Sequence, residues 1–202
     1  MLILSLDTSS NYVSVALVDQ THTYGYLEEE MDRGQAESLM PMIQSVLQKA
    51  QKTMNDVNGV AVTVGPGSFT GVRIGLAAAR AFGLALNVPV YGVTCFEAWA
   101  YHLGRACKVV LDSKRDDYFV QSFDADGNAV TEPAILSADA LKAEMPFIAV
   151  GTGAEALSEE IGCKSVVKIS PIAVAVARIA LSRLDKPMPP NPLYMREADV
   201  TV

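Results

Sequence analysis

Two short turns carry the side chains of this sequence that are best suited to chemistry. The turn Asp7-Thr8-Ser9 follows the apolar segment Leu2–Leu6, and the turn Asp112-Ser113-Lys114-Arg115 follows the apolar segment Val109–Leu111. A carboxylate in such a turn can position a metal ion or a water molecule, and a nearby glycine lets the backbone approach a phosphate. Neither turn contains a glycine. We therefore favour the alternative, in which the polar side chains bond to their own backbone.

A glycine-rich segment, Gly65-Pro66-Gly67-Ser68-Phe69-Thr70-Gly71, is the second candidate site. It does not end in Gly-Lys-Ser/Thr like a P-loop, and its third glycine comes one residue too late for a GxGxxG fingerprint. Amides at the start of the following helix can hold an anion, but a strand-to-helix turn without a ligand fits equally well. The candidate anion-binding or nucleotide-binding residues of the two segments are Asp7, Thr8, Ser9, Gly65, Gly67 and Ser68.

The composition of the chain narrows the class of protein. Half of the 202 residues are hydrophobic, which predicts a packed core, and the formal net charge is −7. An acidic surface repels phosphate backbones, so we expect no tight binding of nucleic acid by this chain alone. Three cysteines without paired spacing and two distant histidines predict neither a disulfide framework nor a metal site.

No segment of the sequence predicts a membrane anchor. The apolar start ends at Asp7, which is too early for a signal peptide. The apolar run Ile172–Leu181 is interrupted by Arg178 and is too short to cross a bilayer. We therefore expect a soluble, cytoplasmic protein that does not associate with membranes.

Hydrophobic periodicity predicts the order β-β-β-α-β-α-β-α in the first half of the chain, and the second half repeats the plan β-β-β-α-β-α in reduced form. In the first half we expect elements at Leu2–Leu6, Tyr12–Val18, Thr21–Glu28, Gln35–Gln51, Gly59–Val64, Thr70–Leu86, Pro89–Val93 and Phe96–Arg105. In the second half we expect them at Val109–Leu111, Tyr118–Phe123, Ala129–Ile135, Ala138–Ala143, Phe147–Val150, after Gly153 and at Ile172–Leu184.

The repeated order indicates an internal duplication. We expect residues 1–106 to form an N-terminal subdomain and residues 107–202 a smaller C-terminal one. This plan resembles that of acetate kinase, Hsp70 and actin, so the predicted fold class is α/β: a duplicated actin-like, Hsp70-like or sugar-kinase-like (ASKHA, ribonuclease H-like) fold. The resemblance implies that a nucleotide would bind between the halves, on the turns that follow the first strand of each half.

The two long helices of the first half have unusual surfaces. The apolar arc of Gln35–Gln51 spans roughly 160°, whereas a helix that faces one core needs only about 100°. The following helix carries a strip of small residues, Gly71, Gly75, Ala79 and Gly83, which costs helix propensity. Close approach of another element compensates for that cost. This element is either the chain's own sheet or a partner helix, and we expect the partner.

Three segments resemble the bacterial TsaB (YeaZ) family over essentially the whole chain. They are GPGSFTGVRIG at Gly65–Gly75, Leu6-Asp7-Thr8-Ser9, and the late segment Pro192–Arg196. The resemblance implies an accessory subunit that pairs with the catalytic subunit TsaD and, with the ATPase TsaE, makes threonylcarbamoyladenosine at position 37 of tRNAs that read ANN codons. It implies contact with tRNA only through these partners, and a homodimer when the chain is alone.

The resemblance also implies that this chain is not itself an enzyme. The catalytic relative holds its metal in a His-Leu-Glu-Gly-His segment, and the matching stretch here is Cys95-Phe96-Glu97-Ala98-Trp99, in which both histidines are replaced. One carboxylate and a thiol fall short of a catalytic metal site. The older glycoprotease (peptidase) label of the superfamily has no support either, because no HExxH motif occurs.

In the TsaB family the two long helices form the dimer surface. The resemblance therefore places a partner interface on Gln35–Gln51 and Thr70–Leu86, with Met40, Ile43, Leu47, Gly75, Ala78 and Ala79 at or beneath it. We expect no cofactor in the isolated chain, although ATP or ADP could bind at the subunit interface. The competing hypothesis is a stand-alone ATPase or small-molecule kinase that uses Asp7 and Asp112.

Overall fold

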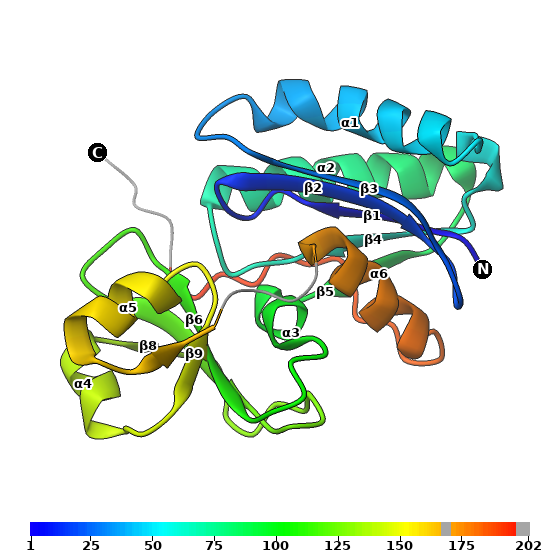
Figure 1. The fold of residues 1–202 in the computed structure, drawn as a ribbon. Coiled ribbons are helices and arrows are strands. Elements are labelled where there is room, and N and C mark those ends of the chain that lie inside the picture. The colour runs from blue at the N-terminus through cyan, green and yellow to red at the C-terminus, as the bar shows by residue number, and fades with distance from the viewer. Residues whose placement is uncertain (167–170, 197–202) are drawn as a thin grey trace. The chain divides into compact units, whose positions relative to one another are not determined.

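The computed structural model describes residues 1–166 and 171–196, which form two compact units, each built on a five-stranded sheet (Figure 1). The two sheets share one plan. A three-stranded antiparallel meander is extended by two parallel strands on the side of its first strand. The predicted fold class, a duplicated α/β fold of the actin-like type, is therefore confirmed.

In the first unit the strand order is β3-β2-β1-β4-β5. The strands are β1 (Ile3–Asp7), β2 (Tyr12–Val18), β3 (Thr23–Glu30), β4 (Gly59–Thr63) and β5 (Val90–Val93). The central strands β1 and β4 are buried along their whole length, because helices cover both faces of the sheet. Strands of this kind are almost continuously apolar, which is why periodicity located both of them.

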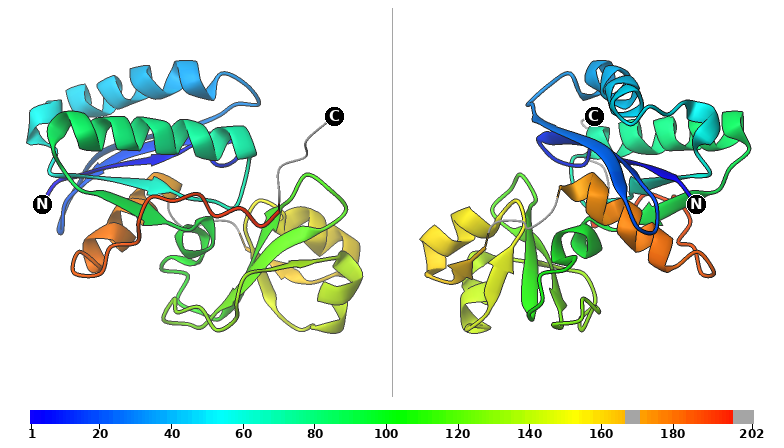
Figure 2. Two further views of the ribbon diagram at one scale, coloured as in Figure 1. Left: turned by 180° about the vertical axis from the view of Figure 1, so that it is seen from behind. Right: turned by 45° about the vertical axis from the view of Figure 1, so that its right-hand side comes forward.

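Two helices cover one face of this sheet and a third covers the other (Figures 1 and 2). Helices α1 (Gln35–Lys49) and α2 (Phe69–Leu86) lie side by side, α1 over β2 and α2 over β4. Helix α6 (Ile172–Ser182) packs against β1 and β2 from the opposite side. Within the described residues, α2 alone has the length and hydropathy to cross a membrane, a property that the core helices of folded proteins share.

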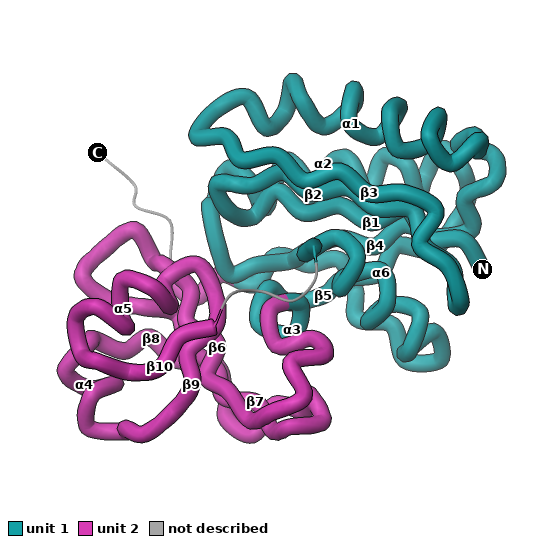
Figure 3. The backbone as a smooth tube through the Cα atoms, viewed as in Figure 1, with its two compact units in different colours: residues 1–98, 170–193 teal, residues 99–169, 194–202 magenta. Residues whose placement is uncertain are grey.

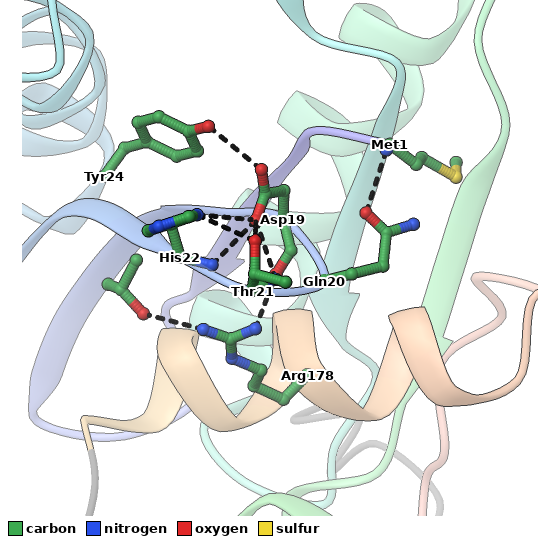
Figure 4. A network of polar contacts seen from close by, with 8 residues as sticks. Met1, Asp19, Gln20, Thr21, His22, Tyr24 and Arg178 are labelled. Atoms are coloured by element: carbon green, nitrogen blue, oxygen red, sulfur yellow. Dashed lines mark hydrogen bonds and ion pairs between the residues drawn. The ribbon is translucent and has the colours of Figure 1, made fainter.

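Helix α6 is held to the sheet by polar contacts as well as by apolar packing. The buried Ser14 hydroxyl accepts the amide of Ala173 at 3.0 Å, and the buried Ser5 hydroxyl donates to the Ala173 carbonyl at 2.7 Å. The Arg178 guanidinium donates to the Asp19 carbonyl at 2.5 Å, in the turn between β2 and β3 (Figure 4). The Asp19 carboxylate in turn accepts the amides of Thr21 and His22.

In the second unit the strand order is β10-β9-β6-β7-β8. The strands are β6 (Cys107–Asp112), β7 (Tyr118–Phe123), β8 (Ala134–Leu136), β9 (Ile148–Val150) and β10 (Lys164–Ser165). Its helices are the short α4 (Ala138–Ala143) and α5 (Ala154–Ile161). Helix α3 (Cys95–Ala100) spans the boundary between the units.

The division of the chain differs from the expected boundary between residues 106 and 107. The first unit joins Met1–Ala98 to the segment that runs from α6 to Leu193, and the second unit holds the described residues of 99–169 and 194–202 (Figure 3). Helix α6, which comes late in the sequence, therefore packs on the sheet that the first residues of the chain form. Periodicity identified α6 as a helix, but it carries no information about which of the two sheets an apolar helix will cover.

Several predicted elements also have different bounds, and α1 and α6 each end two residues early, at Lys49 and Ser182. Helix α3 stops at Ala100 instead of Arg105, because His102 and Gly104 adopt left-handed backbone conformations. The strand expected at Ala129–Ile135 is reduced to β8, which begins directly after Pro133, a residue without an amide to donate to the sheet. Strand β3 lies two residues later than expected, at Thr23–Glu30.

Candidate functional site

The candidate site of the first unit is centred on Asp7, the last residue of β1. Its carboxylate oxygen Oδ1 accepts three hydrogen bonds, from the Ser9 amide at 3.0 Å, the Ser9 hydroxyl at 2.6 Å and the Thr63 hydroxyl at 2.6 Å. Thr63 ends the neighbouring parallel strand β4, and parallel strands bring their carboxyl ends to the same edge of a sheet. Asp7 is 1% exposed, so these bonds lie inside the protein.

Burial governs the protonation of this cluster. Removal from water raises the pKa of Asp7 above its ordinary value and outweighs the hydrogen bonds, which lower it. The Cys95 thiol donates to the Ser9 hydroxyl at 3.1 Å. Burial and, secondly, the nearby Asp7 raise the pKa of this thiol strongly, so the thiolate that nucleophilic chemistry requires is disfavoured.

The glycine-rich segment lies directly on the Asp7 turn. The Ser68 amide donates to the Ser9 carbonyl at 2.7 Å, and the Thr8 hydroxyl donates to the Gly71 carbonyl at 2.6 Å. A Cβ atom at Gly67 would lie 2.2 Å from the Ser9 carbonyl oxygen, and one at Gly71 would lie 2.0 Å from that of Thr8. These glycines therefore allow two backbone segments to touch, and the space that a phosphate would need beside them is filled by the chain itself.

The start of helix α2 is capped from within as well. The Ser68 hydroxyl accepts the Gly71 amide at 3.2 Å, and the Ser68 carbonyl accepts the Val72 amide at 2.8 Å. Amides that are used in this way are not offered to an anion. Of the two readings of the segment that the sequence left open, this geometry favours the strand-to-helix turn.

The corresponding turn of the second unit is also closed by its own chain. Oδ1 of Asp112 accepts the Lys114 amide at 2.7 Å, and its Oδ2 pairs with the Lys114 ammonium group at 2.8 Å. The Asp112 amide donates to the Thr152 hydroxyl at 3.0 Å. A Cβ atom at Gly151 would lie 2.3 Å from the Val110 carbonyl oxygen, so this glycine also serves a close backbone contact.

Glu97, the carboxylate of the Cys95–Trp99 stretch, is engaged in the structure of α3. Its Oε2 accepts both the amide and the hydroxyl of Thr94 at 2.8 Å, and its Oε1 pairs with the Arg183 guanidinium at 2.5 Å. This arrangement is a capping interaction at the start of the helix. Across residues 1–166 and 171–196, no three His, Cys, Asp or Glu side chains gather as they would around a metal ion.

Sequence reasoning missed two members of the Asp7 cluster, Thr63 and Cys95. The register of parallel strands could have suggested Thr63, because it ends the strand that pairs with β1. Cys95 follows β5, two strands away from β1, so only the tertiary fold brings it to Ser9.

The small-residue strip of α2 faces the chain's own sheet, so the expectation that a partner helix covers it is wrong. A Cβ atom at Gly75 would lie 2.7 Å from the Thr8 hydroxyl oxygen, and one at Gly83 would lie 2.3 Å from Val90. Ala79 is fully buried. The strip allows α2 to lie unusually close to β4 and β5.

The predicted interface residues fall into two groups. Met40 is 46% exposed and Ala78 is partly exposed, so both reach the surface. The other four, Ile43, Leu47, Gly75 and Ala79, are buried and lie beneath it. The exposed side of the two helices is nevertheless rich in apolar residues. We call this surface the outer face, and its apolar members are Ala36, Met40, Pro41, Phe69, Ala77, Ala81, Leu84 and Ala85.

The two matching sheets and the turns that follow their first strands define the class of protein. It is a duplicated fold of the actin-like ATPase type in which the turns after β1 and β6 are in close contact with the chain's own backbone.

Comparison with known proteins leads from this class to a family. The family model described as TsaD, tRNA N6-adenosine threonylcarbamoyltransferase, matches residues 11–188. An uncharacterized protein of Mycobacterium tuberculosis is 32% identical over 200 residues, which cover 98% of this chain and 92% of that protein. The tRNA threonylcarbamoyladenosine biosynthesis protein TsaB of Escherichia coli is 28% identical over 170 residues, which cover 77% of this chain and 73% of that protein.

A solved structure agrees with these sequence relatives. YeaZ from Pseudomonas aeruginosa superposes with a TM-score of 0.78 at 24% identity, over 96% of this chain and 99% of that one. The chain belongs to the TsaD family and, within it, to the TsaB (YeaZ) group.

Proposed function

We propose that this chain is a non-catalytic scaffold subunit that pairs with a TsaD homologue in the synthesis of threonylcarbamoyladenosine in tRNA. Membership of the family and the name that TsaB relatives carry support this role. We further propose the finer features that the resemblance implies. They are modification of position 37 in ANN-decoding tRNAs, cooperation with TsaE, contact with tRNA only through the partners, a homodimer when the chain is alone, and a cytoplasmic location.

The engagement of the chain's own carboxylates supports a role without catalysis. Asp7 is buried and its Oδ1 accepts three hydrogen bonds from Ser9 and Thr63, Asp112 is paired with Lys114, and Glu97 is bonded to Thr94 and Arg183. Each of the three carboxylates therefore has a structural task within the chain. We therefore propose that the isolated chain needs no cofactor, and that any ATP or ADP binds where this subunit meets its partner.

The outer face is the single feature that carries the proposal of pairing. Leu84 is 87% exposed, Met40 is 46% exposed and Phe69 is 37% exposed. Two adjacent helices thus expose large apolar side chains and several alanines beside the exposed Arg73 and Arg80, and surfaces that combine exposed apolar residues with arginine are typical of protein interfaces. We propose that α1 and α2 meet a TsaD homologue through this face, and that a second copy of the chain uses the same face when TsaD is absent.

Glutamate substitutions test the outer face. Ala77→Glu and Ala81→Glu place a charge at exposed positions of α2, so the fold should persist while affinity for the TsaD homologue falls at least tenfold in calorimetric titration. Ala143→Glu, at an exposed position of α4, is the matched control and should pair normally. Equal affinity of all three variants and the unaltered chain would exclude pairing through this face.

Titration of the isolated chain with ATP and magnesium separates the scaffold from the competing hypothesis of an ATPase or kinase. We expect neither micromolar binding nor turnover. Turnover that disappears in Asp7→Asn would instead establish an enzyme that uses the Asp7 turn.

A further inference from the structure

The segment that follows α6 runs along the edge of the first sheet and is held there by backbone hydrogen bonds. We call residues 187–193 the C-terminal strap; four of its seven residues are proline. The Gly92 amide of β5 donates to the Met188 carbonyl at 2.8 Å, and the Leu193 amide donates to the Val64 carbonyl at 2.7 Å. The strap therefore begins beside β5 and ends beside the residue that follows β4.

Two glycines make room for the strap. A Cβ atom at Gly92 would lie 2.6 Å from the Pro189 carbonyl oxygen, and one at Gly65 would lie 2.8 Å from the Leu193 carbonyl oxygen. Any larger residue at either position would push the strap away from the sheet. The two glycines thus allow the strap to lie directly against the backbone at Gly65 and Gly92.

Arg80 fastens the strap to α2. The Arg80 guanidinium donates to the Pro190 carbonyl at 2.6 Å and lies 3.4 Å from the Asn191 side-chain oxygen. Prolines restrict the released strap to few conformations. Binding of the strap to the sheet therefore costs less conformational entropy than it would for a flexible segment.

The strap is connected to the Asp7 cluster through Gly65. The outer side of Gly65 contacts Leu193, and the Gly65 carbonyl accepts the Cys95 amide at 2.8 Å. The Cys95 thiol donates to Ser9, whose hydroxyl and amide both donate to Asp7. Gly65 therefore contacts both the end of the strap and Cys95.

We propose that the C-terminal strap is a latch that keeps the Gly65–Gly71 segment closed over Asp7 and Cys95. While the strap lies beside β5 it contacts Gly65 and opposes movement of Gly65 toward it, and Cys95 and Asp7 are 2% and 1% exposed. When the strap leaves, Gly65 loses its outer neighbour and the segment can open without unfolding of the sheet. Such local opening requires less free energy than global unfolding.

The reactivity of Cys95 toward the thiol reagent DTNB tests the latch. The measurement uses the 202-residue chain with Cys107→Ala and Cys163→Ala, so that Cys95 is the remaining thiol. Loss of the charged hydrogen bond in Arg80→Ala should accelerate modification about tenfold under native conditions, while circular dichroism is unchanged. Arg33→Ala, which removes an exposed arginine before α1, is the control and should react at the unaltered rate.

A chain that ends at Lys186 provides the stronger variant and should react faster than Arg80→Ala. The latch is excluded if Cys95 reacts equally slowly in Arg80→Ala and in the control. It is also excluded if the urea dependence of the rate shows that Cys95 reacts only through global unfolding. Should the shortened chain fail to fold, the comparison of Arg80→Ala with Arg33→Ala decides alone.

Discussion

At the scale of single residues, two opposing effects act on the pKa of Asp7. Three donors converge on one of its oxygens, which favours the carboxylate, and complete burial favours the neutral acid. Burial prevails and the pKa of Asp7 is raised. A group whose pKa is higher in the folded state stabilises the fold most below its unfolded value of about 4. That contribution is lost as the pH rises through the raised folded value.

Asp7→Asn should therefore become more stable relative to the unaltered protein as the pH rises from 4 to 8. Asparagine keeps the acceptor oxygen for Ser9 and Thr63 and removes the buried charge, so we expect a gain in stability at pH 8 and almost none at pH 4. Urea unfolding of both proteins across this range measures the difference. A constant difference between pH 4 and pH 8 would show that Asp7 does not titrate with a raised pKa.

Asp7→Ala is the matching disruptive change. It leaves the Ser9 and Thr63 hydroxyls without their acceptor inside the protein, so the free energy of unfolding should fall by about 2–3 kcal/mol at pH 7.

At the scale of elements, α2 has two sides with different tasks. Gly71, Gly75, Ala79 and Gly83 face inward and allow close packing on the sheet, whereas Ala77, Ala81 and Leu84 face outward. The two sets alternate along the helix, and the outward-facing Ala77 and Ala81 are each only two positions away from the inward-facing Ala79. Ala79→Glu would therefore disrupt the fold and could not test pairing, while Ala77→Glu and Ala81→Glu can.

Gly75→Ala should destabilise the protein although alanine is the better helix former. The new methyl group would lie 2.7 Å from the Thr8 hydroxyl oxygen, which is held by its bond to Gly71, and 3.3 Å from Val62. We expect a net loss of about 1–2 kcal/mol, because overpacking outweighs the gain in propensity of about 1 kcal/mol.

Thermal or urea unfolding of Gly75→Ala measures this loss. The companion change Ala77→Gly, at an exposed position of the same helix, should cost about 1 kcal/mol through propensity alone. A Gly75→Ala variant that is more stable than the unaltered protein would contradict the close packing of α2 on the Asp7 turn.

At the scale of the whole molecule, the duplicated plan is completed by a helix from the end of the chain. Helix α6 buries Ile172, Val176 and four alanines, and packs on β1, β2, β4 and β5 of the first sheet. Without it, one face of that sheet would be open to water. The first unit is therefore discontinuous in sequence.

A fragment of residues 1–106 should consequently fail to fold and should aggregate, because its sheet lacks α6. A chain in which a Gly/Ser linker of roughly ten residues joins Ala98 to residue 171 keeps α6 and should unfold cooperatively. Circular dichroism and size-exclusion chromatography distinguish the outcomes. Cooperative unfolding of the 1–106 fragment would instead support a domain boundary between residues 106 and 107, as the sequence predicts.

Features that depend on local interactions, namely the strands, helices and turns, could be predicted from the amino-acid sequence. Turn residues, glycines, prolines and apolar periodicity located nearly all strands and helices, and their repetition predicted the duplicated fold. The segment at Gly65–Gly75 indicated the family through its resemblance, and the structure shows that Gly67, Gly71 and Gly75 make close contacts that leave no room for a Cβ atom.

The tertiary structure alone decided which elements meet. Periodicity shows that α2 has two apolar sides but does not say that Gly75 faces Thr8 while Ala77 faces outward. Similarly, nothing local places Cys95 beside Ser9, α6 on the first sheet, or the C-terminal strap beside Gly65. The physical reason is that backbone conformation is set by near neighbours along the chain, whereas contacts across 80 residues or more depend on how all the apolar surfaces are buried together.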